Sequence, residues 1–205
     1  MSTVNIPTVY IIDDDEAVRE SLALLLDSVD LRHASYASAE EFLAHYSPEM
    51  TGCIVLDVRM PLVNGLELQA ILNEKNNHLP ILFVTGHGDV PMAVEAMQHG
   101  AIDFIQKPYR DEDLLTKIHV GLSLDAEFRQ SLSQFDEIKK RLADLTPREH
   151  QVMEMMIEGH ANKVIAIDLG ISQRTVEIHR SNMMEKMGVK RLADLVRICL
   201  QARVV

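Results

Sequence analysis

The sequence predicts two domains, an α/β domain built on a doubly wound parallel sheet and an all-α domain after it. Three observations support this prediction. Short β-branched runs alternate with amphipathic stretches over the first 120 residues. A segment without Pro or Gly, residues 122–145, follows them. From Thr146 onward every segment has the apolar pattern of a helix.

Five runs in the first domain have the composition of strands. These runs, of which the second and fifth are weaker, are 9–12, 31–36, 54–56, 81–84 and 103–106. Continuous apolar runs of this length are typical of strands buried on both faces of a parallel sheet. The amphipathic stretches between them are 16–28, 39–45, 66–73, 91–98 and 111 onward. Five strands alternating with five helices predict a doubly wound, five-stranded α/β fold.

The segment between the two domains has the spacing of an amphipathic helix. From Phe128 onward, apolar residues are separated by 4, 3, 3, 4 and 3 positions: Phe128, Leu132, Phe135, Ile138, Leu142 and Leu145. A mean of roughly 3.5 fits one helix face, and a flexible linker would contain more Gly, Ser or Pro. We expect one long helix that continues from the last helix of the first domain. Its apolar face either forms a coiled-coil seam or packs on its own domain.

The second domain contains start and stop signals for its helices. Thr146-Pro147-Arg148-Glu149 combines an N-cap threonine, a proline at the first position and a glutamate three residues after the cap. Gly159 can cap the end of this helix. Further on, Gly170 separates a short helix from a longer one that begins at Ser172. The predicted helices are 147–158, 163–168, 173–187 and 191–203. Two helices joined by a short Gly-containing turn indicate a helix-turn-helix.

Length and charge agree with this division into two domains. A chain of 205 residues is long for one domain. We assign residues 1–122 to the first domain, 123–143 to a helical linker and 144–205 to the second domain. The net charge of −11 divides into −13 for residues 1–126 and +2 for residues 127–205. Such an asymmetry suggests two parts with different partners.

Composition also indicates the cellular compartment in which the protein is expected. The apolar fraction of 47% and the charged fraction of 25% are ordinary for globular domains. No apolar run approaches the ~20 residues that cross a bilayer, and residues 1–7 lack the regions of a signal peptide. We therefore expect a cytoplasmic protein without a membrane partner. Cys53 and Cys199 match no metal-ligand spacing, so we expect both to be buried as small hydrophobic residues.

Four of the predicted strands end in residues with reactive or charged groups. The first ends in Asp13-Asp14-Asp15, the third in Asp57 and the fourth in Thr85, and Lys107-Pro108 follows the fifth. In a parallel sheet, ligands bind beyond the carboxyl ends of the strands, so these groups are expected to meet at one edge. Carboxylates gathered there repel one another unless a cation lies between them. Hard oxygen ligands in a small pocket suit Mg²⁺.

This pocket has the parts that phosphoryl transfer needs. A carboxylate can attack phosphorus and form an acyl phosphate. Catalysis then depends mainly on positioning and on neutralising charge. Besides the metal ion, Lys107 supplies a point charge and the Thr85 hydroxyl can donate to a phosphoryl oxygen. An isolated Asp run is usually a solvated turn, and a lone Asp after a strand is often a helix cap. The occurrence of all these groups at strand ends favours a functional site.

Residues 8–120 resemble the receiver domain of two-component response regulators, which has a flavodoxin-like fold. The motifs that carry the resemblance are Ile11-Ile12-Asp13-Asp14, Leu56-Asp57-Val58-Arg59-Met60-Pro61, Thr85-Gly86-His87 and Lys107-Pro108-Tyr109. A narrower motif, from Gly86 through His87, Gly88 and Asp89 to Val94, is similar to the FixJ-like subgroup.

The resemblance implies a role for each residue of the pocket. Asp57 would accept a phosphoryl group from a sensor histidine kinase. Asp14, Asp57 and the backbone carbonyl of Arg59 would hold Mg²⁺, or Mn²⁺ in its place, and Asp13 would reach the metal through water. Lys107 would contact the phosphoryl group, while Thr85 and Tyr109 would form the switch. The Lys107-Pro108 peptide is expected to be cis.

Residues 145–203 resemble the four-helix LuxR/FixJ-type helix-turn-helix domain. The matching motifs are Leu145-Thr146-Pro147-Arg148-Glu149, Asn162-Lys163-Val164-Ile165-Ala166 and Ser172-Gln173-Arg174-Thr175-Val176-Glu177-Ile178-His179-Arg180. The candidate recognition helix is 173–187, whose first half is crowded with polar residues, while Val176, Met183 and Met187 are expected to face the core. Its local net charge of +2 does not by itself distinguish it from a solvated helix.

The resemblance also divides the DNA contacts into two groups. Residues that would face bases are Glu177, Ile178 and Ser181. Residues that would mostly face the DNA backbone are Lys163, Arg174, Thr175, His179 and Arg180. Glu177 departs from the family pattern, because many members have Lys at this position. A glutamate can accept a hydrogen bond from cytosine N4 but repels phosphates, which puts non-specific affinity in doubt.

Together the two resemblances predict a transcriptional response regulator. A sensor kinase phosphorylates Asp57, the chain forms a homodimer through its first domain, and the dimer binds double-stranded DNA and acts on RNA polymerase. It would catalyse nothing beyond its own phosphotransfer and dephosphorylation. One alternative, a phosphatase, would need a second acid near Asp57, where the nearest charged neighbour is Arg59. The other is a phosphorylation-controlled interaction module with little DNA binding.

Overall fold

The computed structural model describes residues 6–86 and 90–201. His87, Gly88 and Asp89 of the FixJ-like motif lie outside the described residues, as does the end of the last predicted helix. The chain divides into two units, Met1–Arg129 and Gln130–Val205. The division falls inside the segment that the sequence assigns to the linker.

The first unit contains the predicted parallel sheet. Its strands have the spatial order β2-β1-β3-β4-β5, and all neighbouring pairs are parallel. Their bounds are β1 Thr8–Ile12, β2 His33–Tyr36, β3 Gly52–Leu56, β4 Ile81–Thr85 and β5 Asp103–Gln106. Ile12 is paired with Leu56, and Leu56 is paired with Phe83. This register brings the residues that follow β1 and β3 together at one edge.

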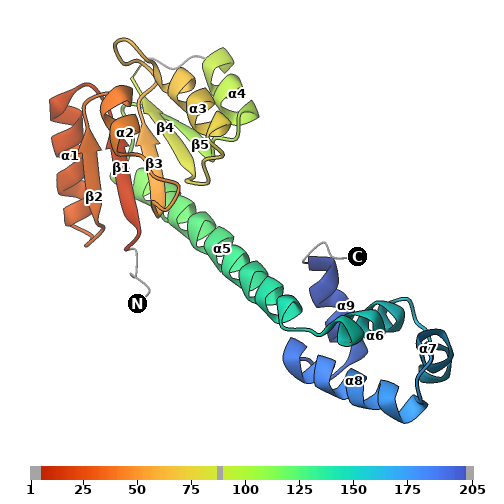
Figure 1. Cartoon of the computed structure of the whole chain (residues 1–205). Coiled ribbons are helices and arrows are strands. Elements are labelled where there is room, and N and C mark those ends of the chain that lie inside the picture. The colour runs from red at the N-terminus through yellow and green to blue at the C-terminus, as the bar shows by residue number, and fades with distance from the viewer. Residues whose placement is uncertain (1–5, 87–89, 202–205) are drawn as a thin grey trace. The chain divides into compact units, whose positions relative to one another are not determined.

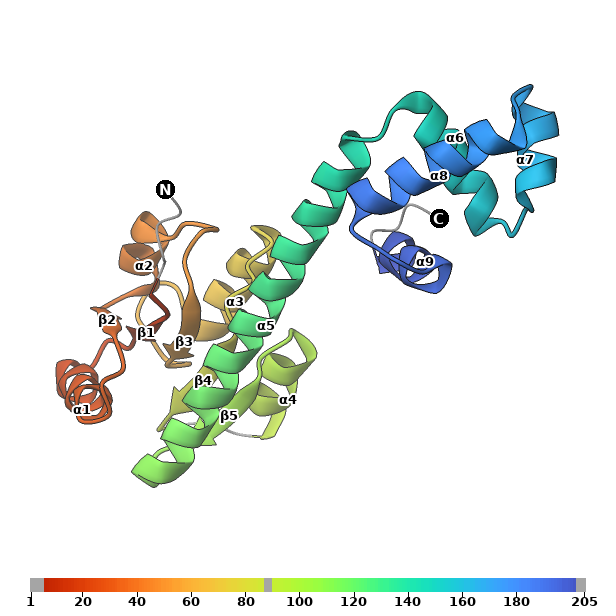
Figure 2. The same ribbon diagram turned by 90° about the horizontal axis from the view of Figure 1, so that it is seen from below.

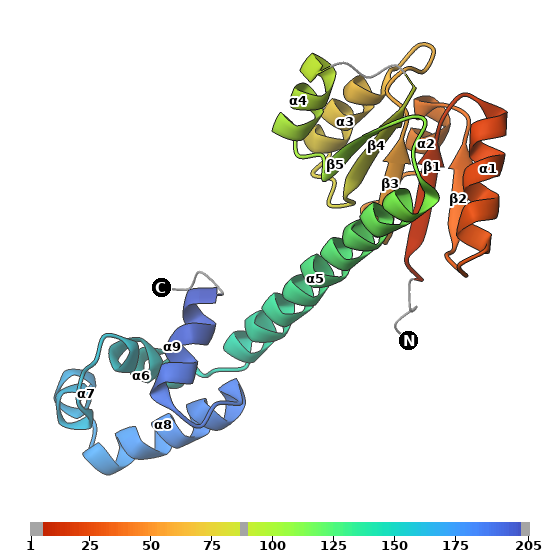
Figure 3. The ribbon, with the colours of Figure 1, turned by 180° about the vertical axis from the view of Figure 1, so that it is seen from behind.

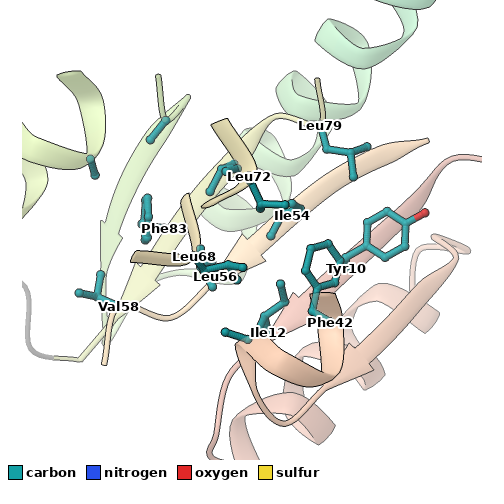
Figure 4. Packing of buried hydrophobic residues seen from close by; sticks show 14 of the residues in the cluster. Tyr10, Ile12, Phe42, Ile54, Leu56, Val58, Leu68, Leu72, Leu79 and Phe83 are labelled. Atoms are coloured by element: carbon teal, nitrogen blue, oxygen red, sulfur yellow. The ribbon is translucent and has the colours of Figure 1, made fainter. Parts of the chain in front are cut away.

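Helices cover both faces of this sheet (Figures 1 and 3). One face is covered by α1 (Glu16–Asp27) and by the beginning of α5 (Asp111–Ala143), whose buried residues share a core with β1, β3 and β4. The other face is covered by α2 Ala39–His45, α3 Gly65–Glu74 and α4 Val90–Gln98. On that face Tyr10, Ile12 and Phe42 pack with Leu56 and Leu68 (Figure 4). The fold is the predicted doubly wound α/β fold.

The long helix expected after the first domain is present as α5. It continues without a break from Asp111 to Ala143, as the sequence predicts. Leu114 and Ile118 are buried in the first unit, whereas Ile138 and Leu142 are buried in the core of the second unit. The last part of the apolar face therefore packs on its own domain, which was one of the two alternatives. Leu132, between these groups, is 46% exposed.

The second unit contains the last part of α5 and the helices that follow it (Figure 2). They are α6 Pro147–Ile157, α7 Asn162–Leu169, α8 Gln173–Met187 and α9 Leu192–Gln201. The predicted caps are confirmed. Thr146 and Glu149 form a reciprocal capping box, and the Ser172 side chain accepts a hydrogen bond from the Thr175 amide. Gly170 ends α7 with a φ of 66°, a left-handed conformation that favours glycine.

The core of the second unit is rich in methionine. Met153, Met156, Met183 and Met187 are all buried there, and Cys199 lies among them. Methionine side chains fill irregular spaces between short helices because they are unbranched and flexible. Cys53 is buried in the first unit, where burial and, secondarily, Asp125 raise the pKa of its thiol to about 12. Both cysteines are thus buried, as predicted.

Among the described residues, none of the helices combines the length and apolar character that crossing a bilayer requires.

Candidate functional site

Two buried carboxylates meet at the carboxyl edge of the sheet. Asp13 follows β1 and Asp57 follows β3, and they are 4% and 7% exposed. The Asp57 amide donates to the Ile12 carbonyl over 2.9 Å, which continues the pairing of β1 and β3 into the site. Lys107 reaches them from the end of β5, where its amide donates to the Thr85 carbonyl. The predicted cis peptide between Lys107 and Pro108 is present.

Lys107 lies between the two carboxylates. Its Nζ is 2.7 Å from Asp13 Oδ2 and 3.3 Å from Asp57 Oδ1. The other Asp57 oxygen, Oδ2, accepts a 2.6 Å hydrogen bond from the Arg59 amide. Burial opposes the charge of Lys107, but Asp13 and Asp57 outweigh it and raise the pKa of Lys107. The lysine is therefore protonated at neutral pH.

The positive charge of Lys107 does not balance the site. Burial raises the pKa of Asp57, and the nearby Asp13 carboxylate raises it further. The hydrogen bond from Arg59 and the charge of Lys107 only partly offset these effects. Two buried carboxylates thus share one ammonium group, and the exposed Asp14 adds a third negative charge nearby. Excess negative charge on hard oxygen atoms fits a divalent cation.

The arrangement differs from the sequence expectation in one respect. The sequence places a cation among three carboxylates, whereas here the Lys107 ammonium group fills the space between Asp13 and Asp57. In the parts of the chain that are described, no three Asp, Glu, His or Cys side chains lie close enough to hold a metal ion. The Asp13 Oδ1 atom instead accepts a hydrogen bond from the Asp15 amide, which shapes the turn.

The two expected switch residues, Thr85 and Tyr109, both lie near Lys107. Thr85, at the end of β4, is 1% exposed. Tyr109 is partly buried and packs against the core that β1, β3 and β4 share with α1 and α5. Burial raises the pKa of its hydroxyl, with Lys107 partly offsetting the effect. Thr85 is thus joined to Lys107 by a backbone hydrogen bond, and Tyr109 follows Lys107 by two residues.

Sequence reasoning missed Gly65, which allows the site to be compact. Gly65 begins α3, and its amide donates to the Val58 carbonyl over 2.9 Å. A Cβ atom on residue 65 would collide with the Asp57 carbonyl oxygen. Asn64 and Glu67 form a capping box that fixes this start of the helix. A side chain at position 65 would push α3 away from Asp57. The Asn-Gly pair and the glutamate after it were the available signal.

The candidate recognition helix, α8, presents most of its predicted contact residues to solvent. Val176, Met183 and Met187 are buried, as expected. The predicted DNA-contact residues that are exposed are Lys163, Arg174, Glu177, Ile178 and Ser181. Those of intermediate exposure are Thr175, His179 and Arg180. Ile178 is apolar and 53% exposed.

Two basic side chains of α8 have internal partners. Arg180 donates to Asn162 Oδ1 over 3.2 Å, which links α8 to the start of α7. Lys186 lies 2.7 Å from Glu149 Oε2, and Glu149 is only 3% exposed. The hydrogen bond from Lys186, together with that from the Thr146 amide, lowers the pKa of Glu149. Part of the positive charge counted from the sequence therefore stabilises the domain.

Comparison with known families matches both units. A model of the response regulator receiver domain matches residues 9–119, and a model of bacterial regulatory proteins of the luxR family matches residues 143–199. Together the two matches define a class of protein, response regulators in which a receiver precedes a LuxR-type DNA-binding domain.

The chain belongs to this family and is a DNA-binding two-component regulator of transcription. It is 49% identical to the transcriptional regulatory protein FixJ of Azorhizobium caulinodans, over 96% of this chain and 93% of that protein. It is 45% identical to the response regulator protein TmoT of Ectopseudomonas mendocina, over 93% of this chain and 86% of that protein. The solved structure of the response regulator StyR is 45% identical, with a TM-score of 0.85 over 95% and 98% of the chains. These relatives are regulators, and no enzyme is among the three.

Proposed function

We propose that Asp57 is the phosphoacceptor of this regulator. The observation that carries the proposal is the pair of buried carboxylates, Asp13 and Asp57, with one ammonium group from Lys107 between them. The Asp57 carboxylate attacks the phosphorus of a phosphohistidine on a sensor histidine kinase. The P–N bond breaks, an O–P bond forms, and the imidazole leaves with a proton. Water later hydrolyses the acyl phosphate, and this is the only chemistry that we assign to the chain.

Asp14, Asp57 and the backbone carbonyl of Arg59 would hold Mg²⁺ or Mn²⁺, with Asp13 contributing through water. The cation supplies the positive charge that the phosphoryl oxygens need during transfer. Lys107 contributes a second positive charge and holds the phosphorylated group in place. The Arg59 amide already donates to Asp57 and positions its carboxylate. These roles are consistent with the excess negative charge of the site, where burial and the Asp13 carboxylate raise the pKa of Asp57.

Phosphorylation would change the face formed by α4 and β5. The Thr85 hydroxyl moves toward the phosphoryl oxygens, and Tyr109 follows into the space that Thr85 leaves. Val94 and Met97 of α4 are 48% and 47% exposed, and they provide apolar area for a second copy. The resulting homodimer places two recognition helices about one DNA turn, roughly 34 Å, apart. The phosphoryl charge at Asp57 thus favours one of two arrangements of the face formed by α4 and β5.

The α8 helix would read DNA through its exposed amino-terminal half. Glu177, Ile178 and Ser181 contact bases, and the flanking basic and polar residues contact phosphates: Lys163, Arg174, Thr175, His179 and Arg180. In this proposal residues 1–122 are the receiver, 123–143 the linker and 144–205 the DNA-binding domain. The dimer acts on RNA polymerase at its target promoters, in the cytoplasm.

The test compares wild type with Asp57→Asn, each treated with acetyl phosphate and Mg²⁺. We expect only wild type to gain a phosphoryl group, to double its mass in solution and to bind promoter DNA more tightly. A variant that responds like wild type would show that Asp57 is not the switch. DNA binding that is absent or independent of salt would instead favour a protein-interaction module, because phosphate contacts impose a steep salt dependence.

A further inference from the structure

Another buried carboxylate, that of Asp125, lies at the opposite end of β3 from Asp57. Asp125 of α5 is 2% exposed. Its Oδ2 atom accepts a 2.9 Å hydrogen bond from the amide of Gly52, the first residue of β3. The Arg129 guanidinium, one turn further along α5, donates to Asp125 through Nε over 2.9 and 3.0 Å and also to the Met50 carbonyl. We call Asp125, Arg129 and the backbone of residues 50–52 the linker anchor.

The backbone of β3 begins in a conformation suited to this contact. Gly52 has a φ of 124°, which side chains other than that of glycine rarely allow. A Cβ atom there would also collide with the Thr8 carbonyl oxygen. Burying a carboxylate is costly unless it is paired and hydrogen-bonded, and Asp125 has both kinds of partner. The anchor is therefore a specific, satisfied site.

The anchor lies where the apolar packing of α5 in the first unit ends. Gly121 packs closely against Cys53, and Leu122 is the last residue of α5 that packs on the apolar core of the first unit among the described residues. Beyond it, Phe128 stacks on His78 with ring centroids 4.2 Å apart. The anchor and this stacked pair both attach residues 123–129 to the first unit. The anchor thus attaches α5 to the first unit beyond the end of its apolar packing, within the linker segment.

One strand joins the anchor to the proposed phosphoacceptor. All five residues of β3, from Gly52 to Leu56, are buried, and Asp57 follows directly. Five residues of strand span about 17 Å. A shift of β3 at Asp57 therefore acts on the Gly52 amide, since a fully buried strand in the middle of a sheet moves as a unit with its neighbours.

We propose that Asp125 and Arg129 are positioning residues that couple the receiver to its linker helix through β3. The anchor keeps residues 123–134 of α5 helical and attached, so that a change at Asp57 reaches the DNA-binding domain. The coupling half of this inference rests on the proposed function of Asp57. The structural half, the attachment of the helix, does not depend on it.

The test uses the full-length chain and two variants. Asp125→Asn keeps the shape of the side chain and an acceptor for Gly52, but it loses the charge that pairs with Arg129. Glu137→Gln is the matched control, because Glu137 and Arg141 form the same i,i+4 pair in the same helix with the glutamate 63% exposed. Amide hydrogen exchange of residues 123–134 is measured first, and then phosphorylation by acetyl phosphate and affinity for promoter DNA.

We expect Asp125→Asn to speed exchange in residues 123–134 by about tenfold, as loss of a charged hydrogen bond would. Its phosphorylation rate stays at the wild-type value, while the gain in DNA affinity on phosphorylation falls by about fivefold or more. Glu137→Gln behaves as wild type in all three measurements. Arg129→Met, which leaves Asp125 in place, gives the same loss of coupling.

Unchanged exchange in Asp125→Asn would overturn the anchor. Faster exchange with an undiminished gain in DNA affinity would overturn the coupling while leaving the attachment. If wild type itself gains no affinity on phosphorylation, the proposed function fails and the coupling fails with it, and the exchange measurement still decides whether the anchor exists.

Discussion

The ammonium group of Lys107 lies 2.7 Å from the carboxylate of Asp13, although the two residues are 94 positions apart in the sequence. The distance from Lys107 to Asp57 is longer, 3.3 Å. Asp13 therefore holds the lysine beside the proposed phosphoacceptor. The lysine is ready to neutralise a phosphoryl group there, and its present pairing leaves the Asp57 carboxylate only partly neutralised.

Replacing Lys107 with Met should separate phosphorylation from its consequences. Asp57 is unchanged, so acetyl phosphate still modifies the chain in the presence of Mg²⁺. The phosphoryl group has lost a cationic partner, however, and we expect the gain in DNA affinity to fall by about tenfold, which corresponds to about 1.4 kcal/mol. Gel-shift titration with the modified and unmodified protein measures this gain. Lys75→Met, an exposed lysine that follows α3, is the control and should keep the full response.

The hydroxyl of Thr85 is predicted to transmit the signal. Thr85→Ala should accept the phosphoryl group but lose most of the shift from monomer to dimer, because no hydroxyl is drawn toward the new phosphoryl oxygens. Thr85→Ser keeps a hydroxyl and should retain the shift. Light scattering before and after phosphorylation gives the mass. A fully dimeric, phosphorylated Thr85→Ala would remove Thr85 from the switch.

The ion pair between Glu149 and Lys186 should make the second unit sensitive to acid. The hydrogen bond from Lys186 lowers the pKa of Glu149 below its ordinary value. The ion pair therefore stabilises the second unit fully above the unfolded pKa of glutamate, about 4.3, and this stabilisation is lost as the pH falls through the lower folded pKa of Glu149. We expect Glu149→Gln to reduce the unfolding free energy of this unit by about 1–2 kcal/mol at pH 7.

Hydrogen exchange of α6 and α8 measures that free energy for the second unit alone. The difference between wild type and Glu149→Gln should shrink as the pH falls from ~4.3 through the lower folded pKa of Glu149, because below that value both side chains are neutral. A difference that is constant from pH 7 to pH 3 would mean that the charge of Glu149 contributes nothing, and that the variant only disturbs the capping box.

Glu177 should limit non-specific binding to DNA. It is exposed in the first half of α8, and in the proposed complex the DNA phosphates would repel its carboxylate. Glu177→Lys is expected to raise affinity for random-sequence DNA by about tenfold at low salt and to increase the salt slope by about 1. Glu185→Lys makes the same change of charge near the end of α8 and is the control. Equal effects of the two substitutions would mean that only net charge matters, and that Glu177 does not face DNA.

The sequence determined much of this protein, because its local signals agree with one another. Apolar runs bounded by Asp13, Asp57 and Thr85 predicted both the strands and the site at their ends. Thr146, Glu149 and Ser172 predicted helix starts, since a cap acts over three or four residues. The spacing from Phe128 to Leu145 predicted a continuous helix in the same way. Periodicity and capping are local effects, which is why one sequence suffices to recognise them.

Tertiary structure decided the partners of charged groups that are distant in sequence. Three such pairs are Lys107 with Asp13, Lys186 with Glu149, and Asp125 with the amide of Gly52. The two members of each pair are separated by 37 to 94 residues in the sequence. The sequence could not choose between a coiled-coil seam and internal packing for α5 either, because both need the same apolar face. Only the three-dimensional arrangement places Ile138 and Leu142 in the core of their own unit. Pairing and burial depend on which surfaces meet, and the local pattern of residues does not specify this.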